Sequence, residues 1–219
     1  MNKKFIFLVL SLVATLYGDF SPIQISESPK IFMICTFLSD EECDYMMDLA
    51  RPRLIPSKVV DEENKGEMDD ARRTSEGCFI HNNWCDSIVV AIEKRIAAIT
   101  SMPIENGEDF NVLRYGVGGE YQPHYDYFNV DTPGGADYAL HGGQRVATLI
   151  MYLNTPEAGG ETIFPKANIF ITPRKGDAVL FYNCSLQTGD VDPNSFHGGA
   201  PVIAGEKWIM TKWIRERGF

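Results

Sequence analysis

Two segments in the first half of the chain carry apolar residues at a helical spacing. In the first segment the apolar positions follow the pattern i, i+3, i+4, i+7, namely Cys43, Met46, Met47 and Ala50. Ser39 and Glu42 form a capping box, so this helix is predicted to begin there and to end before Pro52. A second amphipathic helix is predicted from about residue 84 to residue 99, and Pro103 closes it.

From residue 109 onward the pattern changes to short apolar or alternating segments that have the length of strands. They are residues 110–115, 146–153, 169–171, 178–182 and 208–214, and paired glycines lie between several of them. An earlier strand is predicted within residues 31–38. Many short strands at near-regular spacing are typical of a β-sandwich or jelly roll. Since no linker divides strands from helices, we predict one α+β domain, with a jelly-roll core and N-terminal helices packed on it.

The segment 58–76 interrupts this pattern, because it is charged and poor in residues that form a core. We expect a mobile surface loop there. The whole chain of 219 residues has 20 Lys and Arg against 30 Asp and Glu, a formal net charge of −10. An acidic surface repels phosphate backbones, so we expect no nucleic-acid partner. We expect the protein to be a monomer.

The N-terminus has the pattern of a targeting segment. Lys3 and Lys4 precede an apolar run, residues 5–17, which is typical of a secretory signal peptide. The cleavage site is poorly marked, so an uncleaved anchor that attaches the protein to a membrane through residues 5–17 stays an alternative. We therefore assign residues 1–18 to a signal peptide or anchor and residues 19–219 to the folded domain. The expected location is the endoplasmic reticulum lumen, or a membrane anchor that faces it.

The five cysteines fit this location only loosely, because an odd number leaves at least one thiol free or bonded to another chain. Cys78 and Cys85 are able to form a disulfide in an oxidising lumen, and buried free thiols are the alternative. The sequence has no C-x-x-C pair, which argues against a zinc ribbon or a thioredoxin-like redox site.

The polar residues that stand out are a histidine and an aspartate two positions apart. His124 and Asp126 would project from the same face of a strand, and His197, about 70 residues later, would supply a third ligand from a neighbouring strand. Two histidines and one carboxylate form the facial triad of non-haem Fe(II) oxygenases. Lys207 follows and is a cation suited to the distal carboxylate of a 2-oxoacid. The alternative is a surface His–Asp ion pair with an unrelated histidine and lysine.

Several segments, in this order, resemble the prolyl 4-hydroxylases of the Fe(II)/2-oxoglutarate dioxygenase superfamily, most of all the short enzymes of plants, algae and large algal viruses. The resembling segments are residues 37–43, 73–77, 113–115, 123–128, 159–165, 175–177 and 197–202 with 207–208. The resemblance implies a double-stranded β-helix, which is a jelly roll. It also implies Fe(II), 2-oxoglutarate, O₂ and ascorbate as cofactors and co-substrates.

The resemblance assigns roles to individual residues. It implies that the iron ligands are His124, Asp126 and His197. It implies that Lys207 binds the far carboxylate of 2-oxoglutarate, and that Tyr115 and Thr162 donate hydrogen bonds to it.

Four residues are expected to contact the substrate: Arg145, Tyr125, Tyr127 and Trp213. For Arg145 a structural ion pair is an equal alternative, because a charge that opens an apolar run needs a partner. For Trp213 the alternative is a place in the core. Relatives often have a histidine where this chain has Arg215, so its peptide preference is expected to differ.

The activity that the resemblance implies is hydroxylation of peptidyl proline at C4, coupled to oxidative decarboxylation of 2-oxoglutarate to succinate and CO₂. The substrates would be proline-rich or collagen-like peptides, and residues 58–76 and 128–143 are the candidate lids. One alternative keeps the chemistry but changes the target to another residue or a small molecule. A non-catalytic jelly-roll binding module is the other.

Overall fold

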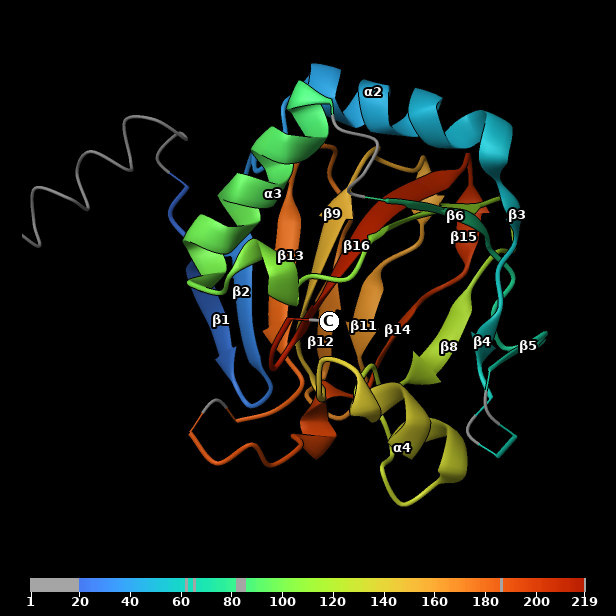
Figure 1. The fold of residues 1–219 in the computed structure, drawn as a ribbon. Coiled ribbons are helices and arrows are strands. Elements are labelled where there is room, and N and C mark those ends of the chain that lie inside the picture. The colour runs from blue at the N-terminus through green and yellow to red at the C-terminus, as the bar shows by residue number, and fades with distance from the viewer. Residues whose placement is uncertain (1–19, 62, 65, 82–85, 186, 219) are drawn as a thin grey trace, which may run out of the picture.

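The computed structural model describes residues 20–61, 63–64, 66–81, 86–185 and 187–218 (Figure 1). An eight-stranded sheet has the order β1-β2-β13-β9-β16-β7-β6-β3, and its pairs are antiparallel. In that order the strands are Ile23–Glu27, Lys30–Ile34, Ala178–Tyr182, Arg145–Tyr152, Lys207–Arg215, Phe110–Tyr115, Glu76–Ile80 and Ile55–Pro56. The predicted segment 1–18 lies outside the described residues.

A second, four-stranded antiparallel sheet has the order β12-β11-β14-β8. These strands are Ile169–Ile171, Thr162–Phe164, His197–Gly199 and Tyr121–His124. Two further pairs are short: β10 (Ala158–Gly159) with β15 (Val202–Ala204), and β4 (Val59–Val60) with β5 (Glu67–Met68). Two antiparallel sheets packed face to face confirm the predicted jelly roll.

The large sheet is buried on both faces. On one face, residues such as Leu113 and Ile150 cluster with Phe164 of the small sheet. On the other face lie α2 (Asp40–Ala50) and α3 (Ser87–Thr100), which contribute Met46 and Ile92 to a second cluster. Figure 1 shows these two helices together, apart from α4 (Pro133–Leu140), which lies near β8. Burial on both faces explains why the strands at the centre of the sheet are apolar almost throughout.

The helix predictions are confirmed with small shifts. The capping box is present, since the Ser39 side chain accepts from the Glu42 backbone and the Glu42 side chain accepts from the Ser39 backbone. The second helix begins at Ser87, because the Asp86 side chain accepts a hydrogen bond from the third helical residue. The start predicted at residue 84 lies outside the described residues. α4 was not predicted, because its paired glycines suggested a turn.

The segment 58–76 contains the β4–β5 hairpin, which the prediction of a mobile surface loop did not anticipate. The turn between its strands is stabilised by Asp61, whose Oδ1 accepts hydrogen bonds from the backbone of Glu63 and Asn64. Ser75, at the end of the segment, is buried. Hydrogen bonds to the Asp61 side chain thus order the turn of this polar segment.

A charged pair lies in the layer between α3 and the large sheet. The Nζ atom of Lys212 is 2.6 Å from Glu93 Oε1, and both side chains are buried. Lys212 also lies over the ring of Phe110, 4.5 Å from its centroid. A Cβ atom at Gly107 would overlap the Lys212 side chain, so glycine leaves the room that this buried ion pair needs.

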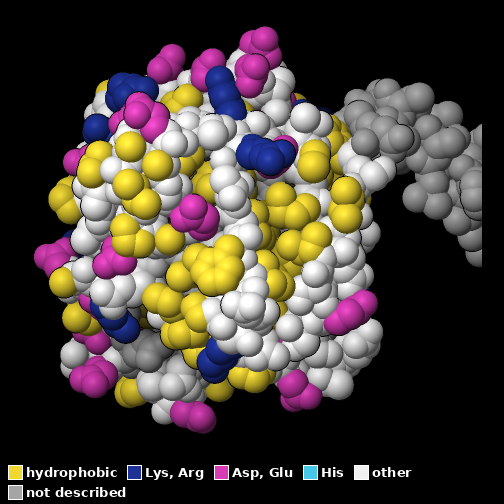
Figure 2. Space-filling view, turned by 180° about the vertical axis from the view of Figure 1, so that it is seen from behind, with side chains coloured by type: hydrophobic (Ala, Val, Ile, Leu, Met, Phe, Trp, Pro, Cys, Tyr) yellow, Lys and Arg dark blue, Asp and Glu magenta, His cyan; other side chains and the backbone are white. Residues whose placement is uncertain are grey.

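The structure also bears on the predictions for the cysteines and for a membrane segment. Cys78 has a free, buried thiol, which supports the free-thiol alternative, while Cys85 lies outside the described residues. In the part of the chain that is described, no helix is long and apolar enough to cross a bilayer. On the face opposite to that of Figure 1, hydrophobic side chains gather toward the centre and charged side chains of both signs surround them (Figure 2).

Candidate active site

The predicted metal ligands converge at the edge of the small sheet. β8 and β14 are antiparallel neighbours, and His124 and His197 are cross-strand partners. Asp126 Oδ1 lies 3.5 Å from His124 Nε2, and its Oδ2 lies 3.6 Å from His197 Nε2. The three ligand atoms lie within 4.8 Å of one another. The expectation that Asp126 belongs to the strand was wrong, because β8 ends at His124, where its pairing with β14 ends.

Both histidines are fixed in the tautomer that a metal site requires. His124 Nδ1 lies 2.9 Å from the carbonyl oxygen of Gln122, and His197 Nδ1 lies 2.9 Å from that of Ser195. A carbonyl oxygen only accepts hydrogen bonds, so each Nδ1 carries a proton, and Nε2 is the nitrogen of each ring that is left to bind a metal. Burial lowers the pKa of His197 to about 4, despite the opposing charge of Asp126, so its imidazole is neutral at pH 7.

Asp126 is buried but charged. Burial acts to raise its pKa, but the positive charge that His197 carries at acid pH, together with the neighbouring His124 ring, outweighs burial and holds the pKa well below its usual range. The Thr148 hydroxyl on β9 donates a hydrogen bond of 2.7 Å to Asp126 Oδ2. Asn183 Nδ2 donates in turn to Thr148 Oγ1 at 3.0 Å. One carboxylate and two imidazole nitrogens on one side of a common centre fit Fe(II) with open positions left over.

Lys207 lies in the cavity that the three ligands line, at the start of β16. Its side chain is buried, and among the described residues no hydrogen bond or ion pair reaches its amine. Burial lowers the pKa of Lys207 to about 8, so the amine still carries a proton at pH 7. A Cβ at Gly199 would lie 3.6 Å from Lys207 Nζ, so the glycine leaves space beside the charge. The amine lies over the Tyr115 ring, 5.6 Å from its centroid, and a buried cation that has only this contact among the described residues is suited to bind an anionic ligand.

The side chains of Tyr115 and Thr162, which carry hydroxyl groups, line the same cavity. The Tyr152 hydroxyl donates a hydrogen bond of 2.8 Å to Thr162 Oγ1, which leaves the Thr162 proton free to be donated to a ligand. Tyr115 is buried, and its hydroxyl interacts with the side chains of Ser75 and Arg73. The cavity therefore combines one cation with neutral donors, which suits a dicarboxylate such as 2-oxoglutarate.

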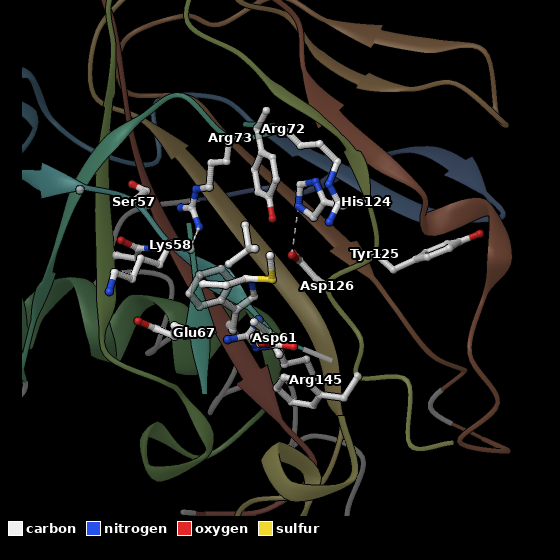
Figure 3. A pocket seen from close by; sticks show the side chains of 18 of the residues that line it. Ser57, Lys58, Asp61, Glu67, Arg72, Arg73, His124, Tyr125, Asp126 and Arg145 are labelled. Carbon is white, nitrogen blue, oxygen red and sulfur yellow. Dashed lines mark hydrogen bonds and ion pairs between the residues drawn. The ribbon is translucent and has the colours of Figure 1, made fainter. Parts of the chain in front are cut away.

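A larger cleft of about 1120 Å³ opens outside the metal site. The β4–β5 hairpin, β8, α4, β9 and β16 contribute to its wall, and it is seen from close by in Figure 3. All four residues predicted to contact substrate line it, namely Arg145, Tyr125, Tyr127 and Trp213. The indole Nε1 of Trp213 is buried and has no hydrogen-bond partner in the described part of the chain.

Arg145 lines the cleft and also forms the alternative ion pair. Its Nε and Nη2 atoms each lie 2.6 Å from a different carboxylate oxygen of Glu108. Its guanidinium lies over the Trp213 ring, with Cζ 3.9 Å from the ring centroid, at a distance typical of a cation–π contact. Arg145 thus forms the structural ion pair with Glu108 and also lines the cleft, so the two interpretations do not exclude each other.

The structure adds functional residues that the sequence did not single out. Thr148 and Asn183 orient the carboxylate ligand, but Thr148 lies inside one apolar run and Asn183 directly follows another, and such runs indicate only strands. Arg73 lies 4.9 Å from the ring centroid of Tyr121, which stacks on His124 with centroids 3.6 Å apart. Figure 3 shows Arg73 beside the metal site, with Tyr125 pointing away from Asp126. In the sequence, the feature that pointed to Arg73 was its place in residues 73–77, one of the segments that resemble prolyl 4-hydroxylases.

A jelly roll that holds two imidazoles and one carboxylate beside a buried lysine defines the class of non-haem iron oxygenases. The sequence model of the 2OG-Fe(II) oxygenase superfamily matches residues 110–215. Prolyl 4-hydroxylase 1 of Arabidopsis thaliana is 46% identical over 216 residues, which cover 91% of this chain and 74% of that protein. Prolyl 4-hydroxylase 5 of the same plant is 40% identical over 214 residues, covering 89% and 71%.

Solved structures agree with these sequence relatives. The viral collagen prolyl hydroxylase of Paramecium bursaria Chlorella virus-1, in a complex with 2OG, matches with a TM-score of 0.67 and 32% identity, covering 84% of this chain and 95% of that one. A prolyl hydroxylase from Trichoplax adhaerens matches with a TM-score of 0.64 at 17% identity and shares the fold. The chain therefore belongs to the prolyl 4-hydroxylase family of the 2OG-Fe(II) oxygenase superfamily.

Proposed function

We propose that this protein hydroxylates peptidyl proline at C4 in proline-rich or collagen-like peptides, and that it couples this reaction to oxidative decarboxylation of 2-oxoglutarate. The observation that carries the proposal is the shared cavity of the His124, Asp126 and His197 ligands and the unpaired Lys207 amine. Relatives named prolyl 4-hydroxylase at 40% and 46% identity support proline as the target.

The three ligands would hold Fe(II), which when bound supplies the activation of O₂. Lys207 neutralises one carboxylate of 2-oxoglutarate, and the hydroxyls of Tyr115 and Thr162 donate to it. Because Lys207 is buried, water does not compete strongly for its charge. These residues therefore bind and orient the co-substrate in the cavity that contains the ligands.

The outer cleft is suited to an extended peptide. A proline-rich chain is already in the polyproline II conformation, so it loses little backbone entropy on binding and fits grooves lined by aromatic side chains. Tyr125, Tyr127 and Trp213 supply aromatic surface. Arg145 lines this cleft, and its Nη1 makes no hydrogen bond among the described residues. This donor would bind a peptide carbonyl group.

The location and the need for a reductant are also proposals. The apolar run 5–17 supports entry into the secretory pathway, either as a cleaved signal or as an anchor facing the endoplasmic reticulum lumen. Protease protection of the full chain in microsomes tests entry, and extraction with carbonate separates an anchored from a soluble form. Ascorbate would keep the iron ferrous between turnovers, so turnover in its absence is expected to decline with time.

The test of the reaction is anaerobic reconstitution with Fe(II) and 2-oxoglutarate, followed by air and (Pro-Pro-Gly) or polyproline peptides. A gain of one oxygen on proline, together with one succinate, supports the proposal, and His124→Ala is expected to abolish both products. Succinate without peptide oxidation would redirect the search to another residue or a small molecule. If folded, iron-loaded protein forms no succinate, the proposed reaction is excluded and a non-catalytic binding module is the remaining interpretation.

A further inference from the structure

Two arginines face each other across the strands that form one wall of the cleft. Arg145 of β9 and Arg215 of β16 are cross-strand partners in the large sheet. Like charges at such positions repel. Glu108 lies between them, because its carboxylate binds Arg145 at 2.6 Å and Arg215 Nη1 at 3.1 Å. Arg215 is 3% exposed, so the group of three charges is formed inside the protein.

Arg215 also reaches the C-terminal end of α4. Its Nη2 atom donates to the carbonyl oxygen of Tyr138 at 2.5 Å and to that of His141. Carbonyl groups at the end of a helix lack partners within the helix and attract cations. One guanidinium therefore connects β16, Glu108 and α4. Only the forked arginine side chain has enough donors in one plane for all these acceptors.

The ring of Phe128 contacts both guanidinium groups. Its centroid is 4.8 Å from Arg145 Cζ and 4.6 Å from Arg215 Cζ, and the ring stacks on Tyr138 of α4. The orientation of Arg145 is thus set from two sides, by the Glu108 carboxylate that Arg215 shares and by the aromatic ring that Arg215 also contacts.

We infer that Arg215 is a positioning residue for peptide binding: it fixes the Glu108 carboxylate, and thereby the direction in which Arg145 faces the cleft, and it fastens α4 as a fixed wall. The inference rests on the proposed function, because Arg145 acts on a peptide. Because Arg215 binds the carbonyl oxygens of Tyr138 and His141, the C-terminal part of the candidate lid, residues 128–143, is held in place.

Arg217 offers a matched control. Its Nη2 atom donates to the α4 carbonyl of Leu140 at 3.3 Å, but its ion pair is with Glu216 and not with Glu108. Arg217→Gln thus removes a bond to α4 and an exposed ion pair with Glu216, whereas Arg215→Gln removes bonds to α4 and the bond to Glu108. Arg215→Lys keeps the charge but loses the fork.

The experiment measures steady-state kinetics with a proline-rich peptide, and succinate formation without peptide. Arg215→Gln is expected to raise the peptide KM about tenfold, since small displacements of positioning groups cost up to ~10²-fold. The 2-oxoglutarate KM and the peptide-independent succinate rate should stay within about twofold, and Arg215→Lys should recover part of the loss. Arg217→Gln should change none of these values. An unchanged peptide KM in folded Arg215→Gln, or an equal loss in every parameter, would overturn the inference.

Amide hydrogen exchange of α4 provides a readout that needs no substrate. Arg215→Gln is expected to accelerate exchange in α4, and Arg217→Gln to do so much less. Equal exchange in wild type and Arg215→Gln would overturn the wall role. A wild-type protein that leaves every proline peptide unmodified would instead overturn the proposed function, and with it the part of this inference that concerns peptides.

Discussion

The hydroxyl of Thr148 donates a hydrogen bond to Asp126 Oδ2 at 2.7 Å, and this bond joins the central strand of the large sheet to the metal site on the small one. Asn183 fixes the direction of the bond, because its Nδ2 donates to the same hydroxyl oxygen and leaves only the proton to point at Asp126. Asp126 is therefore held in one orientation before any ligand binds.

Thr148→Val keeps the shape of the side chain and removes this donor. We expect the affinity for Fe(II) to fall about tenfold, since partners of metal ligands contribute about 10- to 100-fold to affinity. Anaerobic titration calorimetry with Fe(II) measures this. Thr148→Ser retains the hydroxyl and should bind Fe(II) as wild type does. Equal affinity in the valine variant would show that Asp126 does not depend on Thr148.

Removing the Lys207 amine should act on the co-substrate rather than on the metal. A charge-assisted hydrogen bond contributes about 1.5–3 kcal/mol, so Lys207→Ala is expected to weaken 2-oxoglutarate binding by about one to two orders of magnitude. Fe(II) affinity should change little, because the ligands are unaltered. Calorimetry with each ligand separates the two effects. An unchanged 2-oxoglutarate affinity would contradict the assigned role.

The same amine predicts a pH dependence. Burial lowers the pKa of Lys207 to about 8 in the free protein. The amine is then mostly charged at pH 7 and mostly neutral at pH 9, so the affinity for 2-oxoglutarate should fall about tenfold between these values. Lys207→Arg supplies the control, because its guanidinium stays charged throughout this range. A decrease of equal size in that variant would exclude Lys207 as its origin.

The buried pair of Lys212 and Glu93 predicts a different kind of effect. Lys212→Met leaves Glu93 without its partner between α3 and the sheet, which is expected to lower the free energy of unfolding by about 3–5 kcal/mol. The double variant Lys212→Met/Glu93→Leu should recover most of this loss, because no buried charge is left. Urea unfolding of the three proteins decides it. A double variant no more stable than the single one would contradict this reasoning.

The sequence predicted those parts of the site that depend on residue type and spacing. His124, Asp126, His197 and Lys207 are rare residue types at distinctive intervals, and the strands that carry them follow from apolar patterns. The end of β8 at His124 was missed, because it depends on where the pairing with β14 stops. The β4–β5 hairpin was missed because it rests on hydrogen bonds of Asp61 rather than on apolar residues.

The hydrogen-bonded partners of Asp126 and of the two arginines were not predicted, for a related reason. Thr148 in β9 and Asn183 after β13 follow apolar residues and become neighbours of Asp126 only through the register of the strands. Likewise, Glu108 became the shared partner of two arginines through the pairing of β9 with β16. Contacts between distant segments are set by register, which one sequence does not display.

The four-stranded sheet ends at β8, whose outer edge is bridged, among the described residues, only at Tyr121, by Arg73, and one iron ligand lies on β8 while another lies on its neighbour β14. A metal ion held by both strands would stabilise β8 against local unfolding. Its binding free energy would add to the free energy needed to separate β8 from β14. The iron supply of the compartment would then govern how long each molecule resists proteolysis, in addition to how fast it works.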